Sequence, residues 1–400
     1  MLTLTLNLFF IMYFFTMSTT AASDIAMICP RNPERKGLCN LIRSLPLCMD
    51  LHSCKSTFSV VNFRMFWYVL VLLSSRDANA DRMVPADNPH RLVFSKRYHE
   101  SPFRILGVTA FRDLDRSKWS SYKRKNSEYF NWFGNLLQTA LPKYMDIVCF
   151  CESSKCKDIQ EQLNFLNTIE IDLGDTFFKM LYEEKRVMES DEFKNLVRHH
   201  GQGLDLPERH IPEYTLINHS KLSFLRHAMQ LFQRQEGFTH YAWLDFGFIR
   251  RNDLTKQPPV PAKLCWDKLK DGKLHIAVDH VFSAKKVSDE DILFNLQERQ
   301  CEMQGYSFIV PSQKLLWYEA EYTKMYFRYH SLGIVDFDQC IALQVIRENY
   351  DHFALHPPSM WHDWGEFYYE FSCGNITEEK MVGELKGPEK TGGFFSWLGH

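Results

Sequence analysis

The feature that most constrains the fold is an alternation of strand-length apolar runs with helical patterns, which begins at Arg104. ILGVTAF is a continuous apolar run followed by the polar turn RDLDR, and a helical pattern then continues through YFNWFGNLLQTAL to Pro142. The runs DIVCFC and TIEIDL come next, separated by the helical stretch QEQLNFLNT. Continuous apolar runs of this length are typical of strands that are buried on both faces. Strands that alternate with helices predict an α/β fold whose sheet is mostly parallel.

The rest of the folded region is expected to continue this sheet. Residues 174–213 are charged and are interrupted by glycine and proline, which predicts an excursion over the surface. The amphipathic stretch HSKLSFLRHAMQLFQRQ predicts a helix capped by Ser220, and it leads into the strand HYAWLDFGFI. LHIAVDHVF and GYSFIVPS predict two further strands. KLLWYEAEYTKMYFRYHSL predicts a helix that Gly333 ends, and DFDQCIALQVIR predicts another helix.

The chain before this region is expected to hold targeting and linker sequence. An uncharged apolar stretch within residues 1–25 predicts a signal peptide or an apolar anchor. Residues 26–103 show no sustained period and predict a stem, which contains a second apolar run at 65–75. A small-x-small pattern of the kind that signal peptidase cleaves follows that run. If translation begins at Met65, the second run is a signal peptide. The alternatives are that it is a signal anchor or that it is neither.

These segments predict a protein of the secretory pathway, either in the lumen at the ER or Golgi membrane or secreted. A membrane contact would then be made by an N-terminal apolar segment. The glycosylation acceptors Asn218-His219-Ser220 and Asn375-Ile376-Thr377 are compatible with that route, although such tripeptides also arise by chance. Residues 373–400 are expected to form a tail.

Charge and cysteine content exclude two classes of protein. With 47 Lys and Arg against 49 Asp and Glu, the formal net charge is -2, so a dedicated nucleic-acid binder is not expected. The 11 cysteines include no matched C-x-x-C pairs, which argues against a structural zinc site. Cys149, Cys151 and Cys156 lie near the end of an expected strand, where either a short disulfide or buried thiols would be accommodated.

The local sequence singles out Asp245 as a candidate functional residue. It follows the apolar run YAWL and stands two residues before Gly247, which allows a turn and a close approach by a ligand. Ligands of open parallel sheets bind at the carboxyl ends of the strands. A carboxylate there can hold Mg²⁺ or Mn²⁺ and so neutralise a diphosphate, whereas an Asp that only bonds to the amides of a turn is the alternative.

Several segments together resemble the HtrL/YibB family. They are TAFRDLDR, the helix containing Lys221 that runs into YAWLDFGFIRR, and the later GYSFIVPS, LLWYEAEY and DFDQCIAL. The resemblance covers about residues 104–356, and the order of the segments is more specific than any one of them. It implies a GT-A-like nucleotide-sugar transferase domain at 104–372, with a mixed, mostly parallel sheet flanked by helices. A nucleotide-sugar donor, a glycan or glycoconjugate acceptor and Mn²⁺ or Mg²⁺ are then the expected ligands.

The same resemblance assigns donor-binding roles to residues of this chain. The nucleotide base and ribose are expected beside Thr109, Ala110 and Phe111, with polar contacts from Asp113 or Arg116. Lys221 is expected to reach toward phosphate, and Asp245 takes the metal position beside Gly247. The usual motif there has two carboxylates one residue apart, whereas this chain reads Asp245-Phe246-Gly247. With one carboxylate in place of two, either another ligand completes the metal site or the metal is bound weakly.

Residues late in the chain supply the expected acceptor side. The resemblance makes Asp338 a candidate general base, with Asp336 and Gln339 beside it; a helix cap is the alternative for either aspartate. His356 or His362 is a candidate for a late metal ligand, against a structural role for both histidines. The functional expectation is a sugar transferase. A glycan- or nucleotide-binding protein without turnover and a disulfide-stabilised interaction protein are the alternatives.

Overall fold

The computed structural model describes residues 101–171, 175–199, 206–250, 260–278, 284–298, 303–356 and 366–373. All of them belong to one compact unit, Arg76–His400. The signal peptide or anchor predicted at 1–25, nearly all of the stem predicted at 26–103 and nearly all of the tail at 373–400 lie outside the described residues. No helix in the described part of the chain combines the length and apolar character that crossing a bilayer requires.

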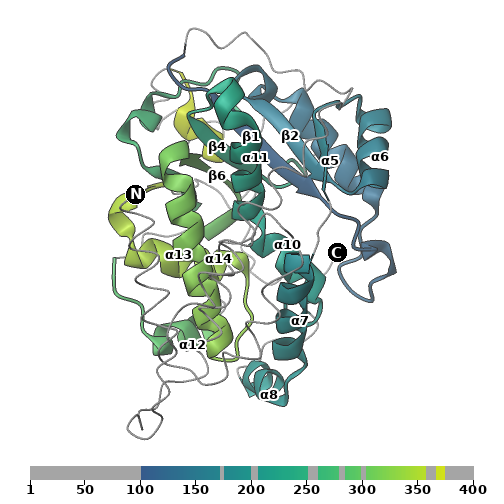
Figure 1. Cartoon of the computed structure of the whole chain (residues 1–400), viewed down its shortest axis with the longest axis vertical. Coiled ribbons are helices and arrows are strands. Elements are labelled where there is room, and N and C mark those ends of the chain that lie inside the picture. The colour runs from purple at the N-terminus through teal and green to yellow at the C-terminus, as the bar shows by residue number, and fades with distance from the viewer. Residues whose placement is uncertain are drawn as a thin grey trace, which may run out of the picture. The chain divides into compact units, whose positions relative to one another are not determined.

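A seven-stranded sheet forms the centre of this unit, with the order β3-β2-β1-β4-β6-β5-β7. Figure 1 labels four of its strands, β1, β2, β4 and β6. The strands are β1 Ile105–Phe111, β2 Asp146–Cys151, β3 Thr168–Glu170, β4 His240–Leu244, β5 Leu274–Val278, β6 Met303–Pro311 and β7 Phe353–His356. Strand β6 runs antiparallel to both of its neighbours, and the other pairs are parallel. The prediction of an α/β fold with a mixed, mostly parallel sheet is confirmed.

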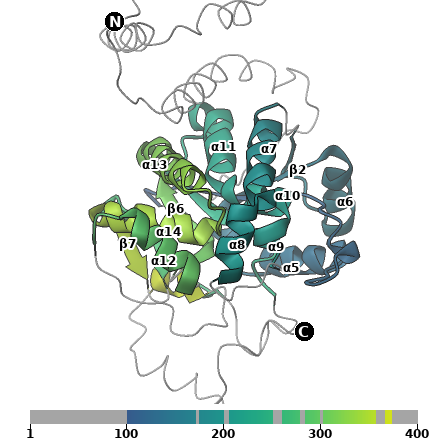
Figure 2. The same ribbon diagram turned by 90° about the horizontal axis from the view of Figure 1, so that it is seen from below.

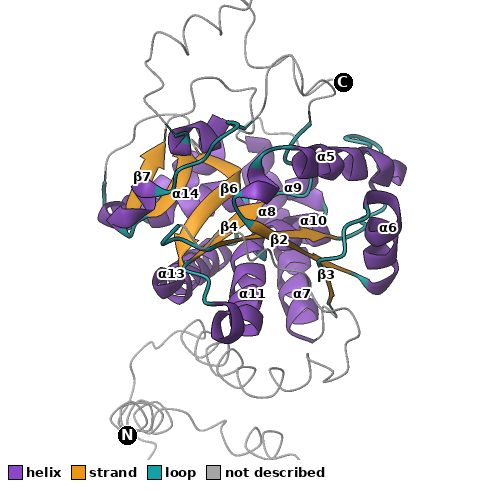
Figure 3. Ribbon diagram, turned by 90° about the horizontal axis from the view of Figure 1, so that it is seen from above, coloured by secondary structure: helices purple, strands orange, loops and turns teal. Residues whose placement is uncertain are grey.

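Helices cover both faces of the sheet (Figure 3). The main helices are α5 Asn126–Gln138, α6 Ser153–Leu163, α11 Lys221–Glu236, α12 Asp289–Glu298, α13 Ser312–Ser331 and α14 Asp338–Glu348. Successive strand residues point to opposite faces, so Leu106 and Val108 pack with α11, α13 and α14, while Ile105 packs with α5 and α6. The short helix η7 Glu366–Phe371 adds its aromatic rings to the second face. Two hydrophobic cores therefore hold the strands of the sheet in place.

The segment predicted as a surface excursion at 174–213 contains helices instead. They are α7 Asp175–Glu189, α8 Asp191–His199, α9 Pro207–His210 and α10 Pro212–His219, and α7 and α10 lie side by side (Figure 2). Phe193 and Val197, one helical turn apart, are buried in a small core of their own. Pro207 and Pro212 begin α9 and α10, where a missing N–H is tolerated. The charges on the outer faces concealed this pattern.

The predicted helix cap at Ser220 is also wrong. The Ser220 hydroxyl donates to the carbonyl oxygen of Leu216 at 2.7 Å and thereby closes the end of α10. Helix α11 begins at the next residue, Lys221. The direct junction of α10 and α11 places the first side chain of α11 against the edge of the sheet.

Disulfides join two pairs of cysteines in the described residues, Cys151–Cys156 and Cys265–Cys373. Cys149 is a free, fully buried thiol, and burial raises its pKa above the usual range. Both readings of the cysteine cluster are therefore realised, since two of its members are bonded and the third packs as an apolar side chain.

Candidate functional site

A pocket lies at the carboxyl ends of the adjacent parallel strands β1 and β4. Its wall includes Ala110 and Phe111 at the end of β1, Asp245 and Gly247 just after β4, and side chains from α5, α10 and α11. The pocket volume of about 130 Å³ is below the roughly 300–1,000 Å³ of sites that enclose a whole small molecule. It has room for part of a larger ligand, such as a diphosphate.

Lys221 forms the ionic centre of one wall. Its Nζ lies 3.2 Å from Oδ1 of Asp245 and 2.9 Å from Oδ2 of Asp338, and it donates to the carbonyl oxygen of Gly305 at 2.7 Å. An ammonium group has three N–H donors, so these three acceptors use all of them. The indole N–H of Trp243 also donates to Oδ1 of Asp245, at 2.6 Å. Residues more than a hundred positions apart in the chain thus form one largely buried cluster.

Burial and charge act in opposite directions on the pKa values in this cluster. Burial alone would lower the pKa of Lys221, but attraction to Asp245 and Asp338 outweighs it and raises that pKa above its usual range. For Asp245 burial raises the pKa, and the nearby Asp338 acts in the same direction, while Lys221 and the Trp243 hydrogen bond oppose the rise. Lys221 is consequently held charged, and it supplies the positive charge that lets two carboxylates lie close together.

The absence of a side chain at Gly305 allows Asp338 and Lys221 to lie this close to the sheet. A Cβ atom on Gly305, in β6, would lie 2.8 Å from Cγ of Gln339 and 3.0 Å from Oδ2 of Asp338. Both distances are shorter than ordinary van der Waals contacts. Glycine at this position therefore lets the beginning of α14 pack directly on β6 and lets the Gly305 carbonyl reach Lys221.

The charge of the pocket wall is strongly positive. Among the described residues that line it, one is acidic, Asp245, and five are basic, namely Arg112, Arg116, Arg124, Lys221 and Arg250. Burial, followed by repulsion from Arg124, lowers the pKa of Arg250 to about 10. A chain with a formal net charge of -2 has thus gathered cations at this place. An anionic ligand would relieve their mutual repulsion.

Aromatic rings hold the arginines in position. The guanidinium of Arg116 lies over Trp119 at 4.6 Å and over Tyr214 at 5.1 Å, and it donates to the hydroxyl of Tyr129. Nε of Arg116 is buried and has no hydrogen-bond partner in the described residues. Arg124 and Arg250 both lie over the ring of Trp132, at 5.4 and 5.2 Å respectively. The wall combines cationic groups with flat apolar surface.

Gly247 contributes to this wall through its packing against Trp132. A Cβ atom there would lie 3.0 Å from the ring of Trp132, so glycine lets that ring pack close to the turn after β4. Nε of Arg250 donates to the Gly247 carbonyl at 3.1 Å. Gly247 thereby helps to position Trp132 and Arg250 beside the pocket.

The structure brings together some of the predicted donor-side residues and separates others. Ala110, Phe111, Arg116, Lys221, Asp245 and Gly247 all line the pocket. Thr109 is fully buried behind it, and its hydroxyl has no hydrogen-bond partner in the described residues. Asp113 bonds to Asn126, Lys155 and the amide of Asp115, which makes it a loop-stabilising group beside the pocket. Lys221 points at the carboxylates of Asp245 and Asp338, and its contact with phosphate stays a prediction.

The predicted acceptor-side residues are also divided. Asp338 lies beside Lys221 with 15% of its side chain exposed, and Gln339 packs on Gly305. Asp336 is buried in an ion pair with Arg209 at 3.1 Å and accepts from the amide of Phe337. Neither aspartate has the predicted cap: α14 is preceded by Phe337, and no side-chain cap bond is formed there.

Of the predicted metal-ligand and glycosylation residues that the structure describes, Asn218 lines the pocket and His356 lies away from it. His356, on β7, lies at 2.9 Å from His275 and at 3.5 Å from Glu370, far along the sheet order from β1. His362 and Asn375 lie outside the described residues. Asn218 lies on α10, donates to the carbonyl of Tyr214 and lines the pocket. A glycan on Asn218 would therefore compete with any ligand of the pocket.

Sequence reasoning missed Arg112, Arg124 and Arg250, which give the pocket its charge. Arg112 directly follows β1 and Arg250 follows the turn after β4. Basic residues just beyond two adjacent parallel strands were the available signal, because the carboxyl ends of such strands meet at one edge. Arg124, in the loop before α5, carried no comparable signal.

The residues at Asp245 do not fit a divalent metal well. One of its oxygens already receives Lys221 and Trp243, and the nearest second carboxylate, Asp338, is bound to the same ammonium. Among the described residues there is no group of three or more His, Cys, Asp or Glu side chains suited to a metal ion. A hard cation prefers several oxygen ligands, which this cluster offers only if Lys221 moves away.

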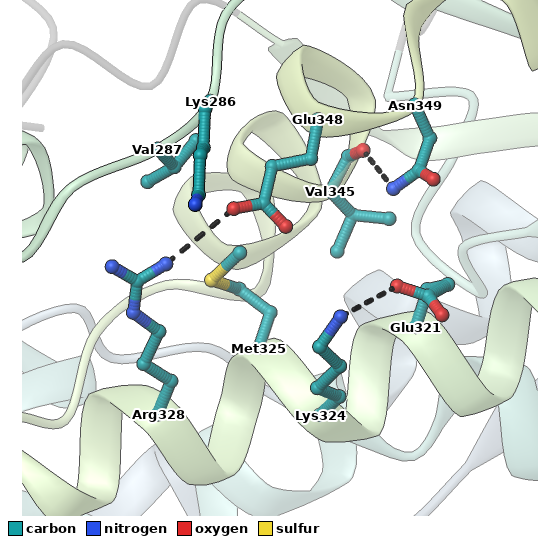
Figure 4. Close-up of a pocket in the computed structure, with 9 residues that line it drawn as sticks. All are labelled: Lys286, Val287, Glu321, Lys324, Met325, Arg328, Val345, Glu348 and Asn349. Atoms are coloured by element: carbon teal, nitrogen blue, oxygen red, sulfur yellow. Dashed lines mark hydrogen bonds and ion pairs between the residues drawn. The ribbon is translucent and has the colours of Figure 1, made fainter.

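A larger cavity, of about 570 Å³, lies between α13, α14 and the segment before α12 (Figure 4). Its charges are largely matched: Arg328 pairs with Glu348 at 3.4 Å and Lys324 pairs with Glu321 at 3.4 Å. The apolar side chains of Val287, Met325 and Val345 also line it. The smaller pocket at β1 and β4 is the better candidate site, because buried and partly buried positive charges converge there.

Fold and pocket together define an α/β protein with a basic, aromatic-lined site at the carboxyl edge of its sheet. The chain belongs to the HtrL_YibB family, described as a bacterial protein of unknown function, which matches residues 104–372. The resemblance noted from the sequence is thereby confirmed. No curated protein matches the chain.

Two solved structures are similar to the chain at a distance. Mouse xyloside xylosyltransferase 1, in its apo form, is 10% identical over 66% of this chain and 93% of its own, with a TM-score of 0.31. The 4-diphosphocytidyl-2C-methyl-D-erythritol synthase of Anaerococcus prevotii is 12% identical over 67% and 96%, with a TM-score of 0.25. Scores of this size do not establish a shared activity.

Proposed function

We propose that the chain is a GT-A-like sugar transferase that binds a nucleotide-sugar donor in the pocket at β1 and β4. The sugar would pass to a glycan or glycoconjugate acceptor. The observation that carries the proposal is the grouping of Arg112, Arg116, Arg124 and Arg250 with aromatic rings around one small pocket. Guanidinium groups match the geometry of phosphate oxygens, and flat rings accept a base or a sugar by stacking.

The transfer step assigns distinct roles to the two sides of the pocket. The arginines would hold the diphosphate and offset the negative charge that grows on it as its bond to the sugar breaks. Asp338 is the candidate to accept the proton of the acceptor hydroxyl while that oxygen forms the new bond to the sugar. The products are the glycosylated acceptor and the nucleoside diphosphate. Gln339, at the start of the same helix, is the candidate neighbour on the acceptor side.

The compartment we propose is the lumen of the secretory pathway, at the ER or Golgi membrane, or the exterior. The disulfides Cys151–Cys156 and Cys265–Cys373 support it, since such bonds persist mainly in oxidising compartments. N-glycosylation is proposed at Asn375 rather than at Asn218, whose amide is bonded within the pocket wall.

The test is a donor-consumption assay of the full chain against a panel of nucleotide sugars, together with calorimetric titration of the donor that is consumed. Arg250→Gln removes one charged donor group, and we expect the affinity for that donor to fall by about tenfold or more. Arg186→Gln is the matched control, because Arg186 is exposed on α7 and pairs only with Glu183 in the contacts described. Its donor affinity should equal that of the wild type.

The outcomes separate the functions. Release of a nucleoside diphosphate that Arg250→Gln weakens supports the transferase. Binding without release, even with glycan acceptors present, would favour a nucleotide-binding protein of the same fold. If no nucleotide sugar binds, or if the two arginine variants behave alike, the proposal is overturned.

A further inference from the structure

The cluster at Lys221 carries an inference that rests on the proposed function and deepens it. We infer that Lys221 is the resident cation of this site: its ammonium occupies the place between Asp245 and Asp338 that a divalent metal would need, so the pocket binds a diphosphate without a metal ion. The phosphate contacts then come from the arginines of the wall.

The coordination of the ammonium is the first observation for this role. Lys221 has acceptors at 3.2, 2.9 and 2.7 Å, which belong to Asp245, Asp338 and the Gly305 carbonyl. Its side chain is 8% exposed, so the charge is held inside the protein rather than in solvent. All of its acceptors are oxygen atoms, the ligand type that Mg²⁺ and Mn²⁺ also prefer.

The position of Lys221 in the chain is the second observation. As the first residue of α11, directly after α10, its backbone is fixed between two packed helices. The Gly305 carbonyl and the two carboxylates come from three other segments. Removal of the ammonium would therefore leave two partly buried carboxylates close together with no cation between them. Removal of a lysine that only covered the surface would not leave carboxylates without a counter-charge in this way.

The distribution of charge is the third observation. One ammonium between two carboxylates leaves that cluster with an excess negative charge, which would repel a diphosphate on its own. Four arginines on the rest of the wall, of which Arg112 pairs with Glu152 at 3.3 Å, reverse the sign of the pocket. In this arrangement Lys221 neutralises the acidic residues, and the arginines do what a bound metal ion does for a diphosphate elsewhere.

The primary experiment uses the wild-type full chain, with UDP as the probe. Titrations with EDTA and with Mn²⁺ should give dissociation constants within about threefold of each other. Titration with Mn²⁺ alone should show no binding in the range where dedicated metal sites saturate. Loss of UDP binding on chelation, or saturable Mn²⁺ binding by the wild type, would overturn the inference.

A second arm uses Lys221→Met, whose unbranched side chain is one atom shorter and carries no charge. The two freed carboxylates and the Gly305 carbonyl form an oxygen site, so this variant should gain Mn²⁺ binding, seen by paramagnetic resonance of the ion. Lys221→Met/Asp245→Asn is the matched control; it lacks one carboxylate and should bind at least about tenfold more weakly. Equal Mn²⁺ affinity in the wild type and in Lys221→Met would count against the inference.

The two arms keep this inference separate from the proposed function. If UDP fails to bind under any condition, the transferase proposal fails, and the Mn²⁺ measurements still decide whether Lys221 fills a cation position. If UDP binds only with Mn²⁺, the nucleotide site stands and the role of Lys221 is rejected. Should Lys221→Met not fold, the wild-type comparison with EDTA decides alone.

Discussion

At the scale of single residues, the buried charges of this protein are held by partners from distant parts of the chain. Arg209 in α9 meets Asp336 before α14, and both side chains are 1% exposed. Burial raises the pKa of Asp336, and the guanidinium of Arg209 opposes the rise. The same guanidinium donates to the Val335 carbonyl at 3.1 Å. The pair therefore ties the α7–α10 segment to the start of α14, which carries Asp338.

Replacing Arg209 should reveal this structural role. Arg209→Met leaves the Asp336 carboxylate buried without its partner, and we expect the free energy of unfolding to fall by roughly 3–5 kcal/mol. Urea denaturation measures it. Arg186→Met is the control, because the pair with Glu183 is exposed and should contribute only about 0–1 kcal/mol. Equal losses in the two variants would show that Arg209 has no special structural importance.

At the scale of elements, the contact between β6 and the start of α14 decides where Asp338 lies. Strand β6 lies between β4 and β5 in the sheet, antiparallel to both. Its residue Gly305 faces Asp338 and Gln339 at distances that leave no room for a methyl group. The start of α14 can therefore pack on β6 in this position only while residue 305 is glycine.

Gly305→Ala should disturb the site and the fold together. The added methyl group displaces Asp338 and Gln339, and overpacking of this kind destabilises proteins by about 1–3 kcal/mol. UDP affinity should fall in the folded fraction, because the Lys221 cluster is displaced.

Gly134→Ala is the matched control for that variant. Gly134 lies within α5, and its added methyl group would meet Leu163 at an ordinary 3.5 Å. Alanine should therefore stabilise the helix by about 0.5–1 kcal/mol and leave UDP binding unchanged. Thermal unfolding and calorimetry on both variants test the pair of expectations. A Gly305→Ala protein as stable and as competent to bind UDP as the wild type would contradict this account of the contact.

At the scale of the whole molecule, the sheet could be predicted from sequence and most of the site could not. Continuous apolar runs identified the strands because burial on both faces leaves a long, unambiguous signal. The position of Asp245 at the end of β4 followed from the same signal. Its pairing with Lys221 and Asp338, and the gathering of Arg112, Arg124 and Arg250, depend on contacts between distant segments. Local periodicity contains no information about such contacts.

Buried histidines make the stability of the whole unit depend on pH. Burial lowers the pKa of His240 and of His275 to about 4, and each repels the charge of a neighbouring histidine. Their pKa in the unfolded chain is about 6.5, so the unfolded state takes up protons first as the pH falls. Stability is complete above about pH 6.5 and is lost progressively down to about pH 4.

The measurement is the free energy of unfolding from pH 7 to pH 5, in the wild type and in His240→Gln. His240 is 5% exposed, and Nε2 has no hydrogen-bond partner in the described residues. The variant removes one of these proton-binding groups, so its stability should fall less steeply over that interval. Identical slopes would show that His240 does not titrate as its burial requires.

The central claim is that the pocket at β1 and β4 holds the diphosphate of a nucleotide. A crystal structure of the full chain with UDP tests it most directly, because the position of two phosphate groups can be read without any assumption about acceptor or turnover. We expect the diphosphate among Arg112, Arg116, Arg124 and Arg250, with Lys221 still between Asp245 and Asp338. UDP in the cavity between α13 and α14, or a nucleotide whose phosphates avoid the four arginines, would contradict the claim.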